Sequence, residues 1–400
     1  MNCPDSVKIP KFNFYIWKLH PTFLTTQTTV PMTNSAQLSK ENDRVLSIDF
    51  FRGITMFLLI GEFSELFGSL MDPYFNGTIV SFIGNQLHHH PWNGLHFWDL
   101  IQPFFMFIVG VSMPFSFTKR WNRGDSWSIT FRHVLKRSFW LLFFGWEIYC
   151  IGPGKIGFRL TNVLAQLSFT YLIAFLLMRK TVKWQLLASF GMILLSYLLF
   201  QFWPIEGYNQ PFVPDHNFGT WVDVNLLGQM NGGHWVAVNA IPTSAHTIWG
   251  VVAGMILMND WTPMKKVKIL FITGIIGVSI GFALDPWIPI IKRICTPSFV
   301  IASGGWAFVA LALSYWMIDV LKFRKGTKFF AIVGMNSLFI YLFAHLGGNE
   351  FLAKIYKPFV PLFFGWGGTL TVDIVVSTLV WLSLWYICYF LYKQKIFIRV

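Results

Sequence analysis

Charged residues are scarce in this chain of 400 residues, since Asp, Glu, Lys and Arg together make up only 12% of it. A soluble domain carries about 25%, so the shortage excludes an ordinary soluble globular protein. Long apolar runs are present instead, and about 20 apolar residues let a helix cross a bilayer. We predict about ten spans, at roughly residues 47–69, 98–117, 134–151, 161–178, 184–203, 236–257, 266–284, 299–319, 328–346 and 370–392. The expected fold class is all-α, a polytopic bundle of transmembrane helices.

Cysteine is also rare, with four in the whole chain. The four residues are Cys3, Cys150, Cys295 and Cys388. They lie far apart and show no metal-ligand spacing, which argues against a cysteine-based metal site. Cys150 and Cys295 are both expected near the outer face, so one disulfide bond between them stays open at this point.

The polar, Thr-rich residues 1–44 lack the apolar core of a signal peptide. We interpret them as a loosely ordered cytoplasmic arm. Residues 45–400 show neither an appended soluble domain nor a convincing internal repeat. They are therefore predicted to form a single transmembrane domain.

Lys and Arg are absent from two long segments, 71–98 and 205–245, although the formal net charge is +13. If the N-terminus is cytoplasmic, 25 of the 31 basic residues fall in cytoplasmic segments, including the loop 119–137. This positive-inside asymmetry predicts that both termini are cytoplasmic and that the number of spans is even. Because the basic residues are spread over alternate loops, we expect no nucleic-acid partner.

Three consecutive histidines, His88 to His90, precede a predicted span that opens with Asp99. Imidazole is the side chain best suited to move a proton or carry an acyl group near neutral pH. We predict that His89 is catalytic and that Asp99, the nearest intramembrane carboxylate, orients its second ring nitrogen. Adjacent residues on one segment rarely converge on one ion, so no metal is expected.

Polar side chains inside the predicted spans are costly to insert, so each needs a partner or a function. Arg52 either pairs with Asp49 or binds a phosphate-bearing donor from the cytoplasmic side. Asn162 and Gln166 share a helical stripe with Arg159, which either lines an aqueous cavity or joins helices.

Other polar positions approach the outer face. Glu62 and Glu65 are either a carboxylate pair near the reacting group or a hydrated helix end. His234 enters the sixth predicted span from outside. In the ninth, His345 lies on a stripe with Asn336 beside it, and a lone histidine of this kind is more often a packing residue than a catalyst.

Several of these segments resemble the heparan-α-glucosaminide N-acetyltransferase family. The resemblance covers about residues 44–393, and the element His-x-x-Trp-Asn-Gly-Leu with its following Asp span is the most specific part. The similar segments are Val45–Met56, His89–Leu95, Asp99–Gly110, Arg159–Gln166, Gly250–Gly254 and Gly334–Ser337 leading to His345. Two elements depart from the family pattern: Glu62–Ser64 stands where an asparagine is usual, and Gly233–Val236 replaces an acidic element.

The resemblance implies that acetyl-CoA is taken from the cytoplasm and that its acetyl group is moved to the amine of an amino sugar on the far side. It also implies that the histidine at position 89 is catalytic, and we predict Asp99 and Asn93 as further catalytic residues. The residues predicted to bind acetyl-CoA are Arg52, Lys119, Arg120, Arg137, Asn162, Gln166 and Asn336. Those predicted for the saccharide acceptor are Trp92, Glu62, His234 and His345. The resemblance also implies a bacterial inner membrane with its lipids as surroundings, and it leaves a homodimer open.

Two alternatives remain at this point. An O-acyltransferase of envelope polysaccharide would use the same histidine on a hydroxyl group. A proton-coupled secondary transporter of a sugar or organic anion would use the intramembrane His, Asp and Arg residues as a proton relay, but inverted repeats are not visible in the sequence.

Overall fold

The computed structural model describes residues 45–152 and 154–398, and this part of the chain is helical, without a β-strand. The predicted arm, residues 1–44, lies outside the described residues, so its looseness stays a prediction. The long helices are α2 (Leu46–Glu62), α5 (Ile101–Trp121), α6 (Trp127–Ile151), α7 (Val163–Met178), α8 (Val182–Gln201), α10 (Ala240–Met258), α11 (Pro263–Leu284), α12 (Pro297–Tyr315), α13 (Thr327–Met335), α14 (Ser337–Phe343) and α17 (Gly368–Lys393). Each of the ten predicted segments overlaps one of these helices, and the ninth is divided between α13 and α14.

Six helices in the described ranges are long and apolar enough to cross a membrane, and a seventh span results if the bent pair Thr327–Met335 and Ser337–Tyr356 counts as one. Three predicted spans fall outside this set. Helices α2 and α7 have 17 and 16 residues, and α6 carries several charged side chains along its 25 residues. The fold class is therefore a polytopic helical membrane protein, while ten spans and cytoplasmic termini stay predictions.

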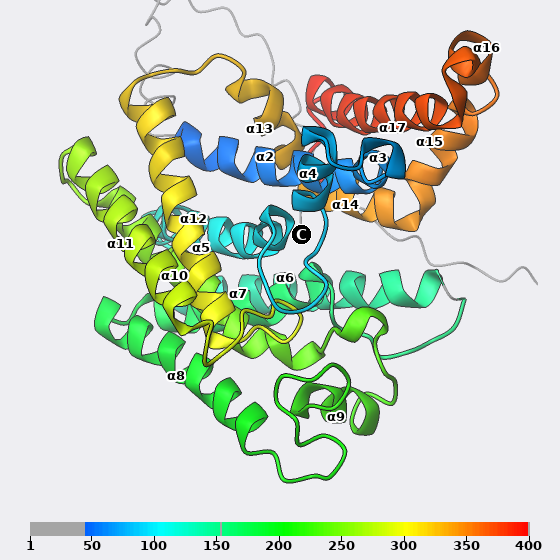
Figure 1. The fold of residues 1–400 in the computed structure, drawn as a ribbon. Helices are drawn as coiled ribbons and strands as arrows, with labels where there is room; N and C mark the ends of the chain where they lie inside the picture. The colour runs from blue at the N-terminus through cyan, green and yellow to red at the C-terminus, as the bar shows by residue number, and fades with distance from the viewer. Residues whose placement is uncertain (1–44, 153, 399–400) are drawn as a thin grey trace, which may run out of the picture.

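Helix α5 lies in the middle of the bundle (Figure 1), with α2, α13 and α17 on one side and α6, α7 and α8 on the other. Helices α11 and α12 pack along each other at one flank. Glycine allows a close contact between α5 and α10: a Cβ on Gly110 would collide with the Thr247 carbonyl, and one on Gly250 with the Phe107 carbonyl. Small residues are what let transmembrane helix backbones approach.

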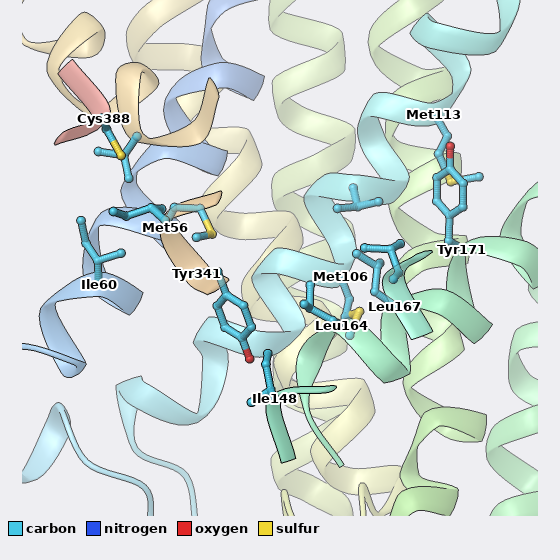
Figure 2. Packing of buried hydrophobic residues seen from close by; sticks show 14 of the residues in the cluster. Met56, Ile60, Met106, Met113, Ile148, Leu164, Leu167, Tyr171, Tyr341 and Cys388 are labelled. Atoms are coloured by element: carbon cyan, nitrogen blue, oxygen red, sulfur yellow. The ribbon is translucent and has the colours of Figure 1, made fainter. Parts of the chain in front are cut away.

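Apolar side chains fill the space between α2, α14 and α17. Figure 2 shows Met56 and Ile60 of α2 beside Cys388 of α17, with Tyr341 of α14 directed toward Ile148 of α6. Cys388 is fully buried and acts as a small apolar residue.

The disulfide bond left open between Cys150 and Cys295 is not formed, because both residues are free thiols. Cys150 lies on α6 beside the Gly157 carbonyl, whereas Cys295 is buried against Thr243 of α10. The two thiols therefore have separate surroundings.

Two helix ends differ from the predicted boundaries. The first predicted span, 47–69, ends at Glu62, because the Ser64 hydroxyl donates to the Gly61 carbonyl at 2.7 Å and Glu65 adopts a left-handed φ of 67°. The fourth begins at Val163, with Asn162 as its N-cap. Arg159 therefore lies in the preceding loop, and the stripe predicted to join it with Asn162 and Gln166 on one helix is wrong.

Short helices form the connections beyond the ends of the long ones. They are α3 (Leu66–Ser69), α4 (Ile79–Gln86), α9 (Phe218–Asn225), α15 (Asn349–Tyr356) and α16 (Val360–Phe364). Helices α3 and α4 join α2 to the histidine segment, and α9 belongs to the long connection between α8 and α10. These connections place polar side chains over one end of α5.

Candidate functional site

The loop that carries His89 is held at both of its ends. Where α4 ends, the His88 ring nitrogen Nδ1 lies 2.9 Å from the Gly84 carbonyl oxygen. Farther along, Gly94 has a φ of 145° and donates its N–H to the Ile290 carbonyl at 2.8 Å. A Cβ at Gly94 would collide with the His90 ring. Glycine is thus required for the loop to fold back on the loop between α11 and α12.

His89 and Asp99 form a hydrogen-bonded dyad, with His89 Nδ1 2.9 Å from Asp99 Oδ1. Asp99 is 1% exposed. Its second oxygen, Oδ2, accepts the backbone N–H groups of His90 at 3.2 Å and His96 at 2.9 Å. These bonds fix the carboxylate, so it accepts a hydrogen bond from the Nδ1–H group and leaves Nε2 of His89 as the free base. The predicted pairing of these two residues is present.

Lys292 lies against the same dyad, although no role was predicted for it from the sequence. Its Nζ is 3.2 Å from His89 Nδ1, 3.7 Å from Asp99 Oδ1 and 3.5 Å from the Trp98 carbonyl oxygen. The residue is only 5% exposed. A signal was nevertheless present, because Lys292 and Arg293 are two of the few basic residues expected on the outer side.

Burial and Lys292 together set the charge of His89. Burial of the ring lowers its pKa and the neighbouring Lys292 ammonium lowers it further, while the hydrogen bond to Asp99 opposes both, and the result is a pKa of about 4. The imidazole is therefore neutral near pH 7. A neutral, partly accessible imidazole can act as a general base or as a nucleophile.

Aromatic rings and a second His–Asp pair lie next to this dyad. The Trp235 ring meets the His89 ring edge to face, with 5.4 Å between centroids. Trp92 donates its indole N–H to the Phe212 carbonyl at 2.8 Å, and its ring lies 5.9 Å from that of His234. His234 Nδ1 is 2.6 Å from Asp215 Oδ2. The structure thus brings Trp92 and His234, both predicted acceptor residues, to one partly exposed surface beside His89.

Glu62 approaches the dyad from the end of α2. The Trp98 indole N–H donates to Glu62 Oε1 at 3.0 Å, and the Glu62 carboxylate attracts Lys292. His345 lies near the same helix end, because its ring contacts Phe63, the residue after Glu62, at 4.5 Å between centroids. Both predicted acceptor residues are therefore at this end of the bundle.

A chain of buried amides connects the site with the bundle interior. Gln166 is fully buried, accepts from Gln102 and donates to Asn239 Oδ1 at 2.5 Å. Asn239 in turn donates to the Arg293 carbonyl at 3.1 Å, next to Lys292. Gln166 thus supports the loop that carries Lys292.

Asn162 has a more local environment. Its Oδ1 accepts the Ala165 N–H at 3.0 Å, capping α7, and its Nδ2 donates to the Gly145 carbonyl of α6. Both amide atoms are engaged in holding α6 and α7 together.

The predicted phosphate-binding residues lie away from the dyad. A hollow of about 360 Å³ at the end of α5 is lined by Ser116, Lys119, Arg120, Arg123 and Asp125. Arg120 is 3.7 Å from Asp125, which balances part of its charge. Arg137 is outside this hollow: its guanidinium covers the Tyr171 ring at 4.6 Å.

Arg52 lies deeper, where its guanidinium donates to the Ser112 hydroxyl of α5. Two other predicted residues, Asn336 and Asn93, make no hydrogen bond to the dyad in the described part of the chain. Asn336 is buried at the break between α13 and α14 and uses both amide atoms on the C-terminal segment, at Ile396 and Ile398. Asn93 is exposed.

The described residues contain no group of three or more His, Cys, Asp or Glu side chains arranged to hold a metal ion. The histidines near His89 use their ring nitrogens separately. His88 contacts Gly84, His96 Nδ1 lies 3.0 Å from the His88 carbonyl oxygen, and His90 packs on His96 at 4.7 Å between centroids.

Residues 44–152, which contain both members of the dyad, match a family model described as a domain of unknown function, DUF5009. The chain is also 26% identical to the heparan-α-glucosaminide N-acetyltransferases of Homo sapiens, over 91% of its length, and of Mus musculus, over 90%. It spans 61% of the length of each of these curated relatives. The predicted resemblance is thus confirmed, and the chain is similar over about nine tenths of its length to the heparan-α-glucosaminide N-acetyltransferases.

Proposed function

We propose that this chain is a membrane acetyltransferase that moves an acetyl group from acetyl-CoA to the amine of an amino sugar or glycan. The observation that carries the proposal is the dyad: a neutral imidazole whose Nδ1 lies 2.9 Å from the buried Asp99 carboxylate, at one end of a helical membrane bundle. The similarity to the acetyltransferases over 91% of the chain supports the type of group transferred.

In the reaction, the acceptor nitrogen forms a bond to the acetyl carbon and the carbon–sulfur bond of the thioester breaks. His89 Nε2 takes the proton that the amine loses, and Asp99 stabilises the imidazolium that forms. The thiolate of coenzyme A leaves and receives this proton from His89. An acetyl group carried transiently on Nε2 balances equally well and splits the same transfer into two steps.

Distances along α5 indicate how the donor lies. Ser112, the partner of Arg52, is 13 residues from Asp99 and Lys119 is 20 residues away, which at 1.5 Å per residue is about 20 and about 30 Å. The pantetheine arm has about 13 bonds between sulfur and phosphorus and spans roughly 16 Å when extended. A thioester at His89 therefore places the diphosphate near Arg52 and leaves the ribose phosphate within reach of Lys119.

The acceptor then approaches from the partly exposed surface formed by Trp92, Trp235 and His234. Aromatic rings offer an apolar face to a sugar ring, and Glu62 offers a carboxylate to its ammonium group. The outer side of a bacterial inner membrane is the location we propose for this surface, with the Lys119 hollow on the cytoplasmic side.

The proposal is tested by incubating membranes that contain the protein with isotopically labelled acetyl-CoA and glucosamine. We expect labelled N-acetylglucosamine from the wild type and none above background from His89→Ala. His133→Ala, at an exposed position of α6, is the matched control and should keep full activity. Undiminished transfer by His89→Ala would remove the dyad from the reaction.

An O-acyltransferase is a second candidate, because the same neutral imidazole can deprotonate a hydroxyl group. Comparing glucosamine with its N-acetylated form as acceptor separates the two: only an O-acyltransferase accepts the blocked amine.

A transporter is favoured by one observation, the 71° bend between α13 and α14, since broken helices often form transporter binding sites. Uptake of sugar into proteoliposomes without acetyl-CoA would support that function instead.

A further inference from the structure

We propose that Lys292 is a positioning residue whose ammonium group neutralises Asp99, so that the carboxylate orients His89 without holding the imidazole in its protonated form. The inference rests on the function proposed above, because it assigns the charge balance of the same dyad. It concerns a residue that comes from a loop 203 positions away from His89 in the chain.

The need for such a residue follows from the dyad itself. A carboxylate beside an imidazole favours the imidazolium, and opposite unit charges about 4 Å apart at an effective dielectric constant near 20 raise a histidine pKa by roughly 3 units. Asp99 alone would thus work against burial, the largest cause of the lowered pKa of His89, and would favour the protonated ring that has no free base. A positive charge beside the Asp99 carboxylate offsets its effect on the pKa of His89, while the hydrogen bond that fixes the tautomer of His89 remains.

The Lys292 ammonium is placed to do this. Nζ lies 3.7 Å from Asp99 Oδ1 and 3.2 Å from His89 Nδ1, so both members of the dyad experience its charge. The Trp98 carbonyl at 3.5 Å and the face of the Trp235 ring at 5.6 Å complete its surroundings. Only 5% of the residue is exposed, so water screens this charge little.

The other charged groups around the dyad support the same balance. Arg293, from the same loop, also repels a proton on His89. Glu62, from α2, attracts the Lys292 ammonium as well. Burial lowers the pKa of Lys292, and the Asp99 and Glu62 carboxylates oppose this shift. Two carboxylates near one buried amine favour its charged form.

The test measures the protonation of His89 directly. Diethyl pyrocarbonate modifies neutral imidazole, and tandem mass spectrometry of the 87–97 peptide assigns the modification to His89 rather than to its neighbours. The rate of modification of the purified wild type is followed from pH 3.5 to pH 8. We expect a midpoint near pH 4, in agreement with the lowered pKa. A wild-type midpoint near the ordinary value of about 6.5 would overturn the proposal without any variant.

Lys292→Met removes the charge and keeps a similar shape. We expect the midpoint to rise by about 1 to 2 pH units, so that a two-unit rise lowers modification at pH 5 about tenfold. Lys292→Arg keeps the charge and should restore a low midpoint, whereas a purely structural role predicts that neither variant moves it. Lys354→Met makes the same substitution at an exposed position of α15 and should behave as the wild type.

The acid limb of the pH–rate profile for acetyl transfer should move with the modification midpoint. If no transfer is found but the midpoint shifts in Lys292→Met, the proposed function fails and the role of Lys292 stands. If transfer is found but the midpoint stays near 4 in Lys292→Met, the role of Lys292 is refuted and the acetyltransferase remains.

Discussion

Asp99→Asn separates two roles of the buried carboxylate, which holds the loop through backbone N–H groups and fixes the tautomer of His89. Asparagine has nearly the same shape, and its Oδ1 can still accept the N–H groups of His90 and His96. Its Nδ2 then faces His89 Nδ1 and donates to it. This selects the opposite tautomer, with the proton on Nε2, so the imidazole can no longer take a proton from the acceptor.

The expected loss is large because the base itself is removed from the reaction. General base catalysis is worth about 10² to 10⁴ in rate, which corresponds to about 3 to 5 kcal/mol in the activation free energy. The free energy of unfolding also falls, because Lys292 loses a carboxylate 3.7 Å away. Breaking one partner of a buried ion pair costs about 3 to 5 kcal/mol, and Glu62 offsets part of this.

The assay is single-turnover acetyl transfer at saturating acetyl-CoA, with the melting temperature measured on the same sample. In the double variant Asp99→Asn with Lys292→Met, the ammonium that lost its carboxylate is removed as well. The melting temperature should therefore recover in part, because Glu62 then lacks the Lys292 charge, while the rate stays low. A folded Asp99→Asn protein that transfers acetyl within threefold of the wild-type rate would refute the role of the dyad.

Three further predictions follow from the same geometry. Arg52→Gln should raise the Michaelis constant for acetyl-CoA about tenfold or more, which corresponds to the loss of one charge-assisted hydrogen bond. Arg120→Gln should raise it less, because Asp125 already balances part of the Arg120 charge. Initial rates at varied acetyl-CoA test this order, and equal effects of the two variants would contradict the placement of the diphosphate. The wild-type rate of acetyl transfer should be flat from pH 7 to about pH 5 and fall near pH 4 as His89 becomes protonated. The free energy of unfolding should also decrease below pH 6.5, because His89 binds its proton at a higher pH in the unfolded chain than in the folded one. A rate that halves near pH 6.5 would contradict the lowered pKa of His89. Gln166→Leu leaves buried amide partners unsatisfied, so it should lower the free energy of unfolding by about 1 to 3 kcal/mol. Thermal denaturation measures this change, and an unchanged melting temperature would show that the chain of buried amides does not support the site.

The sequence predicts the helices well and their interruptions poorly. Apolar runs identify where the long helices lie, because insertion into a bilayer depends on local hydropathy. The same runs continue through Glu62 and through Asn336, where the chain leaves the helix for reasons that hydropathy does not record. At Glu65 a left-handed residue ends the run, and at Asn336 the C-terminal segment occupies the break.

The sequence also predicts only part of the candidate site. His89 and Asp99 are ten residues apart, so their pairing could be predicted from one short segment. The role of Lys292 could not be predicted from one segment, because its contact with His89 joins loops 203 positions apart. Which loops meet over the end of α5 depends on how the whole bundle packs, and local patterns do not contain that information.

The most direct test of the account places donor and acceptor on opposite sides of a sealed membrane. Proteoliposomes of known orientation receive labelled acetyl-CoA at the face that carries Lys119 and glucosamine at the face that carries His89. We predict labelled product only on the glucosamine side, and none when the two substrates exchange sides. Product that forms only when both substrates share one side would contradict transfer through the bundle.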